Sequence, residues 1–196
     1  MLGAEQHGFI ASIGFDLYTQ LLAAAIRELK GEPAEAVVEP SIELAVDAYL
    51  PDSYVSDPKQ KIEVYKRLVS ARSLTEVDAL SEEIEDRFGP SPEPVITLVA
   101  LSRVRVLAQA LRITGLSFKR DRLLLRGSPE SSVGQESLHA LARRFPGRLL
   151  PGAAKAPELG IRVSPKAPPR DVLNVAEDAL RTIWAAWHDA QEEKSG

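Results

Sequence analysis

Residues 95–126 carry the sequence VITLVALSRVRVLAQALRITGLSFKRDRLLLR, and this stretch decides the fold that we expect. From Val95 to Ile113 it is apolar on most sides at helical spacing, which is typical of a helix with other elements around it. We expect Gly115 to cap that helix, and the residues after it predict a β-hairpin with its turn near Arg120-Asp121. The expected fold class is therefore α+β, with helices packed around a long central helix and a small, mostly antiparallel sheet.

Upstream of this stretch, the sequence predicts a strand and an amphipathic helix. Apolar residues alternate with polar ones over residues 42–50, which predicts a strand with one buried face. Asp57 followed by Pro58 is typical of a helix start, with the aspartate as the N-cap and the proline in the first turn. The apolar stripe expected on that helix consists of Ile62, Tyr65 and Val69.

A second helix is predicted over residues 74–88. Ser73 and Glu76 have the spacing of a capping box, and Gly89-Pro90 ends the pattern. At about 100° per residue, Glu83 and Arg87 lie together on the side opposite the apolar face, and Asp86 lies nearby on the same outward arc. The apolar face expected to be buried consists of Leu74, Val77, Leu80, Ile84 and Phe88.

The last third of the chain predicts two more helices and two short strands. The helices are expected over residues 132–145 and from Pro168-Pro169 to about Gln191, with strands near 148–150 and 159–163. Trp184 and Trp187 continue the apolar stripe of the last helix. We expect them to be core anchors.

Composition and motifs argue against an enzyme. The 196 residues include no cysteine, no Gly-x-x-x-x-Gly-Lys phosphate loop and no Gly-x-Ser-x-Gly elbow. The three histidines, His7, His139 and His188, lack a metal-ligand spacing. We therefore expect no catalytic residue, no metal and no cofactor. The amino-terminal residues do not resemble a signal peptide, and no apolar run is long enough to span a membrane, so we expect a cytoplasmic protein.

The charge is unevenly distributed along the chain. Residues 31–100 contain 15 acids and 6 bases, whereas residues 101–126 contain 7 bases and 1 acid. The basic segment leaves open an alternative function as a nucleic-acid-binding module. The overall net charge of −4 and the lack of interleaved aromatic residues argue against this alternative. The bases concerned are Arg103, Arg105, Arg112, Lys119, Arg120, Arg122 and Arg126.

Three segments, taken in order, resemble bacterial transcription-repair coupling factors (Mfd). LGAEQHGFIASIGFDLYTQLL at residues 2–22 resembles the end of that family's second motor domain. LPDSYVSDPKQKIEVYKRL at 50–68 and DRFGPSPEP at 86–94 resemble its C-terminal domain. The resemblance implies that residues 1–30 are the tail of the preceding motor domain with a connecting helix, and that residues 31–196 are a C-terminal regulatory domain of a larger intracellular protein.

The resemblance also implies a function and partners. In this family the full protein displaces RNA polymerase stalled at DNA damage and recruits the excision-repair protein UvrA, while its motor binds DNA and ATP outside the region matched here. The C-terminal domain packs on an amino-terminal module that resembles UvrB and hides the UvrA-binding surface. For this chain we therefore expect an autoinhibitory role, with Glu83, Asp86 and Arg87 forming an ionic patch that contacts the UvrB-like module.

Overall fold

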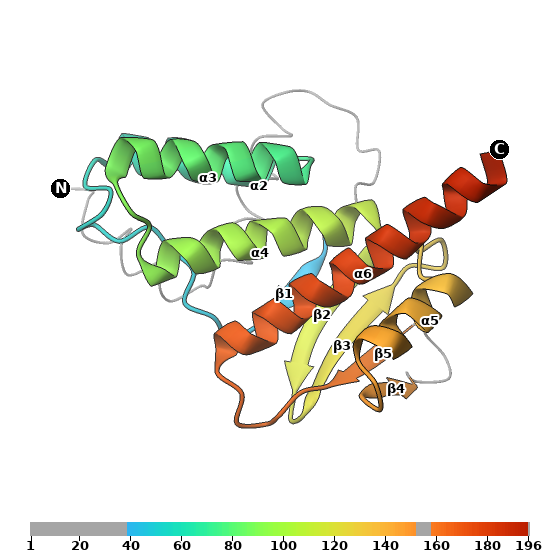
Figure 1. The fold of residues 1–196 in the computed structure, drawn as a ribbon. Helices are drawn as coiled ribbons and strands as arrows, with labels where there is room; N and C mark the ends of the chain where they lie inside the picture. The colour runs from blue at the N-terminus through green and yellow to red at the C-terminus, as the bar shows by residue number, and fades with distance from the viewer. Residues whose placement is uncertain (1–38, 152–157, 196) are drawn as a thin grey trace. The chain divides into compact units, whose positions relative to one another are not determined.

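Figure 1 shows the computed structural model, in which residues 39–151 and 158–195 are described. They divide into a helical unit, residues 47–102, and a sheet unit, residues 39–46 and 103–195. Helix α4 (Glu93–Ala110) contributes its first half to the helical unit and its last turns to the sheet unit. The segment 1–30 and the domain boundary expected after it lie outside the described residues, as do residues 31–38.

The helical unit consists of α2 (Pro58–Ser70), α3 (Leu74–Phe88) and the start of α4 (Figure 1). The predicted N-caps are confirmed: the Asp57 carboxylate accepts from the Lys59 backbone N–H at 2.9 Å, and the Ser73 hydroxyl accepts from the Glu76 N–H at 3.2 Å. Such bonds satisfy backbone donors that the first helical turn leaves unpaired. Local sequence therefore sets where both helices begin.

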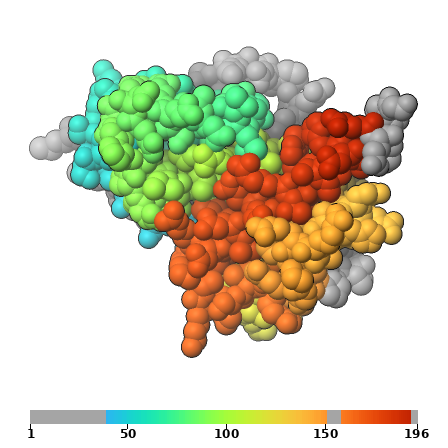
Figure 2. All heavy atoms as spheres, in the orientation of Figure 1, coloured from blue at the N-terminus to red at the C-terminus, as the bar shows by residue number. Residues whose placement is uncertain are grey.

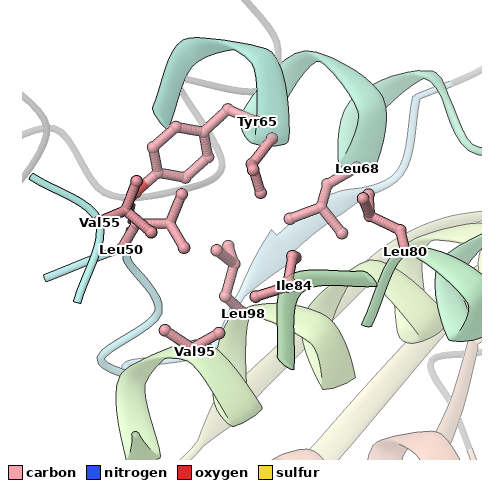
Figure 3. Packing of buried hydrophobic residues seen from close by; sticks show 9 residues of the cluster. Leu50, Val55, Tyr65, Leu68, Leu80, Ile84, Val95 and Leu98 are labelled. Carbon is pink, nitrogen blue, oxygen red and sulfur yellow. Dashed lines mark hydrogen bonds between the residues drawn. The ribbon is translucent and has the colours of Figure 1, made fainter. Parts of the chain in front are cut away.

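The core of the helical unit lies where α2, α3 and α4 face one another (Figure 3). Tyr65 and Val69 are buried as expected, but Ile62 is 41% exposed, so its place on the buried stripe of α2 was predicted wrongly. The buried positions of α2 are 64, 65, 68 and 69, and Ile62 lies to the side of that cluster. The core cluster comprises Leu50, Val55, Val64, Tyr65, Leu68, Leu80, Ile84, Val95 and Leu98.

The end of α4 differs from the sequence expectation. The helix stops at Ala110, and Ile113 already belongs to a strand, so Gly115 is not its cap. Arg112 instead takes a positive φ of 54°, in the left-handed region where glycine usually ends a helix. The backbone can turn there because the Arg112 carbonyl accepts from the Ser128 N–H at 2.9 Å, a partner that sequence spacing does not reveal.

The sheet unit contains a five-stranded sheet in the order β1-β2-β3-β5-β4. All neighbouring pairs are antiparallel except β1 with β2, which confirms the expected mostly antiparallel sheet and the α+β class. The predicted hairpin turn is confirmed at Arg120-Asp121, between the paired residues Lys119 and Arg122. The strands are β1 (Ser41–Glu43), β2 (Ile113–Lys119), β3 (Arg122–Gly127), β4 (Leu149–Pro151) and β5 (Glu158–Arg162).

The strand expected over residues 42–50 is much shorter than predicted. β1 ends at Glu43, which pairs with Ser117, although its partner β2 continues to Lys119. The predicted alternation persists beyond it: Leu44, Val46 and Ala48 are partly buried, and the residues between them are exposed. The alternating pattern therefore predicted correctly which side is buried, but it could not show where the hydrogen-bonded pairing of β1 with β2 ends.

Two helices lie side by side against the sheet, α5 (Gln135–Arg144) and α6 (Pro169–Ser195) (Figures 1 and 2). Arg144 of α5 pairs with Asp178 of α6 at 2.8 Å. The expected core role of the tryptophans is corrected: Trp184 and Trp187 are only partly buried, because the fully buried stripe of α6 ends at Ile183. Their rings lie 5.5 Å apart at the surface end of that stripe.

Among the residues that the structure describes, no helix combines the length and the apolar character needed to cross a bilayer.

Candidate interaction surface

The outward side of α3 carries the residues singled out in the sequence, and α2 supplies a fourth. The apolar residues Val77, Leu80 and Ile84 of α3 face the core, so the residues between them face outward. Figure 2 shows α3, coloured green, at the surface of the helical unit. Arg67 lies in the last turn of the neighbouring α2 and reaches the same outward side.

Glu83 is at the centre of a three-residue ionic network. Arg67 donates from both terminal nitrogens to the two carboxylate oxygens of Glu83, at 2.7 and 2.6 Å. Arg87 donates to one of those oxygens at 3.0 Å, which confirms the predicted i,i+4 pair. A guanidinium bound to both oxygens of a carboxylate fixes the carboxylate in distance and direction. The network therefore joins α2 to α3 across 16 residues of sequence.

The network changes the acidity of its central carboxyl. The hydrogen bonds from Arg67, and then those from Arg87, lower the pKa of the Glu83 carboxyl from 4.5 to about 2. The same contact raises the pKa of Arg67 above its ordinary value. About 37% of the Glu83 side chain is exposed, so solvent screens the pair and limits its contribution to stability. At neutral pH the Glu83 carboxyl is therefore ionised.

Asp86 differs from Glu83 although it lies on the same helix. It is exposed, and within the described residues its carboxylate has no hydrogen bond and no ion pair. The structure thus brings Glu83 and Arg87 into one network with Arg67 and leaves Asp86 available beside it. Sequence reasoning missed Arg67, whose only signal was a cation in the last turn of a predicted helix.

The Asp-Arg-Phe-Gly segment at the end of α3 is held by the Leu-Pro-Asp-x-Tyr segment that precedes α2. The Tyr54 hydroxyl donates to the Gly89 carbonyl at 2.6 Å, and its ring lies 5.9 Å from the Phe88 ring. Gly89 has a φ of +87°, a conformation that suits glycine at a helix end. The Arg87 guanidinium lies 5.1 Å from the centre of the Phe88 ring. These contacts fix the backbone that presents Arg87.

The other candidate chemistries find little support in the described residues. Among the described residues, no group of three or more histidine, cysteine, aspartate or glutamate side chains is placed to hold a metal ion. His139 and His188 lie on different helices. A small hollow of about 40 Å³ lies on the sheet unit, lined by side chains of both charges such as Lys119 and Glu158. It has room for one or two waters.

The basic segment 103–126 does not form a continuous stripe in the described structure. Arg105 lies within α4 with only 3% of its surface exposed, and the other bases are spread over α4, two turns and two strands. Acids lie beside several of them, in the pairs Arg112–Glu130, Lys119–Glu43, Arg122–Asp121 and Arg126–Glu158. A nucleic-acid backbone would need those bases together and unpaired.

Comparison with known proteins places the chain in a family. Residues 44–138 match the model of the TRCF domain. The transcription-repair-coupling factor of Bacillus subtilis is 37% identical over 169 residues, and that of Myxococcus xanthus is 34% identical over 185 residues. These alignments cover 85% and 93% of this chain, and the chain spans 14% and 15% of the length of those relatives.

A solved structure supports the same assignment at the level of the fold. The crystal structure of the C-terminal domain of a transcription-repair coupling factor is similar to this chain with a TM-score of 0.66 at 24% identity. The similarity covers 77% of this chain and 95% of that domain. The chain therefore belongs to the TRCF domain family, found in the C-terminal part of transcription-repair coupling factors.

Proposed function

We propose that this chain is the non-catalytic C-terminal regulatory domain of a transcription-repair coupling DNA translocase. In this proposal it acts by autoinhibition: it contacts the UvrB-like amino-terminal module of the same protein and masks the surface that binds UvrA. Residues 1–30 would be the tail of the motor domain, and residues 31–196 the regulatory domain. RNA polymerase and DNA would be engaged by other parts of the protein, and the chain itself would need no cofactor.

The observation that carries the proposal is the outward ionic surface of α3. Glu83 and Arg87 are hydrogen-bonded to each other, Asp86 lies beside them with no partner for its carboxylate in the part of the chain that the structure describes, and all three point away from the core. Charged contacts can be specific and yet released when a competing partner binds, whereas a large apolar interface resembles a domain core and tends to be permanent. An autoinhibitory contact needs that reversibility.

The test is a triple alanine substitution at Glu83, Asp86 and Arg87 in the full-length protein. Without polymerase present, it should raise the affinity for UvrA about tenfold or more, because loss of one partner of a desolvated charge pair costs about 2–5 kcal/mol. Affinity can be measured by titration with purified UvrA, and folding by thermal unfolding.

A matched control replaces one glutamate, one aspartate and one arginine in the sheet unit. Glu136, Asp189 and Arg143 are all exposed, and their triple alanine variant should bind UvrA like the unaltered protein. If the α3 variant is folded and binds UvrA no better than this control, the proposed function is wrong.

A further inference from the structure

Arg67 joins the ionic surface of α3 from a different helix. Both of its terminal nitrogens are bound to Glu83, at 2.7 and 2.6 Å, and these are shorter than the 3.0 Å contact between Glu83 and Arg87. We propose that Arg67 is a positioning residue of this surface: it holds Glu83, and through Glu83 the guanidinium of Arg87, in the orientation that a partner surface contacts. The inference rests on the proposed function and names the residue that prepares its contact site.

The count of hydrogen-bonding groups separates the roles of the four side chains. A carboxylate offers about four acceptor positions, and Glu83 already uses three of them. Arg87 uses one of its five N–H donors in this network, and the Asp86 carboxylate uses none of its acceptors within the described residues. Glu83 therefore has the least capacity left for a partner and Arg87 and Asp86 have the most, while Arg67 has both of its terminal nitrogens engaged in holding Glu83.

The arrangement has a physical advantage for binding. Arginine side chains lose much rotamer freedom when they are ordered, and a partner that has to order them binds more weakly. Here Glu83 holds two arginines before any partner arrives, and the Phe88 ring lies 5.1 Å from the guanidinium of one of them. Removal of Arg67 would leave Glu83 bound only to Arg87, on a single helix, and both side chains would gain freedom.

The experiment is a pair of double-mutant cycles in the full-length protein, with affinity for UvrA in the absence of polymerase as the readout. Arg67→Ala alone should raise that affinity about two- to fivefold, the factor that corresponds to loss of an exposed ion pair. If Arg67 acts through Glu83, the affinity for UvrA of the double variant Arg67→Ala, Glu83→Ala should be little higher than that of Glu83→Ala alone. Arg67→Ala combined with Asp86→Ala should instead give the product of the two single effects.

Two further measurements test the Arg67–Glu83 contact itself, and thermal unfolding checks that each variant is folded. In the Arg67→Ala variant, carboxyl NMR titration should show the pKa of Glu83 rising from about 2 toward 4.5, since its largest cause is removed. Arg67→Lys keeps the charge but cannot bind both oxygens in the same way. Its affinity for UvrA and its Glu83 pKa should both lie between those of the alanine variant and the unaltered protein. Lys66→Ala, an exposed cation on the same helix, should change neither readout.

The outcomes distinguish the two proposals. If the triple variant of α3 raises UvrA affinity and Arg67→Ala does not, the positioning role of Arg67 is wrong and the proposed function stands. Full multiplicativity of Arg67→Ala with Glu83→Ala would likewise overturn the positioning role. If the triple variant itself has no effect, both are wrong, whatever the Glu83 titration shows.

Discussion

The helical unit and the sheet unit carry their surface charges in different ways. In the helical unit, Arg67 and Arg87 bind Glu83 at 2.6 and 3.0 Å, within hydrogen-bonding distance. In the sheet unit, Lys119 lies 3.9 Å from Glu43 and Arg126 lies 3.8 Å from Glu158, which are loose pairs, whereas Arg144 and Asp178 form a hydrogen-bonded pair at 2.8 Å. A hydrogen-bonded network presents charges in one geometry, whereas loose pairs present an average over many. Glu83 binds two arginines at once, and this three-residue network is why we favour the helical unit as the place of a specific contact.

The two units also differ in which contacts set the first and last residues of their helices. In the helical unit, Asp57, Ser73 and Gly89 act on residues within four positions of themselves. In the sheet unit, Arg112 takes a positive φ of 54° after α4, and its carbonyl accepts from the Ser128 N–H, 16 residues further along the chain. Local chemistry thus sets these helix ends in the first unit, whereas a contact between distant residues holds the end of α4 in the second.

The largest expected effect tests whether each unit has its own complete core. Leu68→Ala in the helical unit and Leu123→Ala in the sheet unit both remove a side chain that is fully buried. Each should lower the free energy of unfolding by about 2–5 kcal/mol, measured with urea. Leu138→Ala, at a leucine that is 40% exposed, is the control and should cost much less. A negligible cost for Leu123→Ala would mean that the sheet is not packed as described.

The next effect concerns the aromatic end of α6. Because Trp184 is only partly buried, Trp184→Ala should cost about 2 kcal/mol, roughly half the 3–5 kcal/mol of a fully buried tryptophan. Differential scanning calorimetry can measure the loss. A cost near the upper value would restore the expectation that this tryptophan is a core anchor, and no loss would show that the ring contact with Trp187 is without consequence.

The third effect sharpens the claim that local caps shape the helical unit. Ser73→Ala removes the hydroxyl that accepts from the Glu76 N–H at the start of α3. We expect a loss of about 1 kcal/mol in urea unfolding. Thr75→Ala, an exposed position in the same first turn, is the matched control. If both variants lose the same amount, the cap is not what stabilises this helix start.

The smallest effect depends on pH and tests the network at Glu83. Its folded pKa of about 2 lies below 4.5, so its pairing stabilises the fold fully above about pH 4.5 and less as the pH falls toward 2. Glu83→Gln should therefore cost about 0.2–1 kcal/mol at pH 7, and this cost should shrink between pH 4.5 and 2. Glu82→Gln, an exposed neighbour, should stay within about 0.5 kcal/mol of the unaltered chain at pH 7.

A pH-independent cost of Glu83→Gln would contradict the network, because the carboxylate would then contribute by packing alone. The comparison between units would lose its main support, since the charges of α3 would be no better ordered than those of the sheet.

The sequence by itself determined the features that depend on neighbours within a few residues. Helix starts at Asp57 and Ser73, the hairpin turn at Arg120-Asp121 and the Glu83–Arg87 pair all follow from spacing of four residues or fewer. The α+β class followed as well, because helices with one apolar face and paired strands have few ways to bury that surface.

The tertiary structure decided what depends on residues far apart in the chain. β1 pairs with β2 over only three residues, and the Ser128 N–H holds the turn at Arg112. The same holds for Arg67, which reaches Glu83 only because α2 and α3 pack on a shared core. Periodicity along one helix shows which residues share a face, but not which residue of another helix that face will meet.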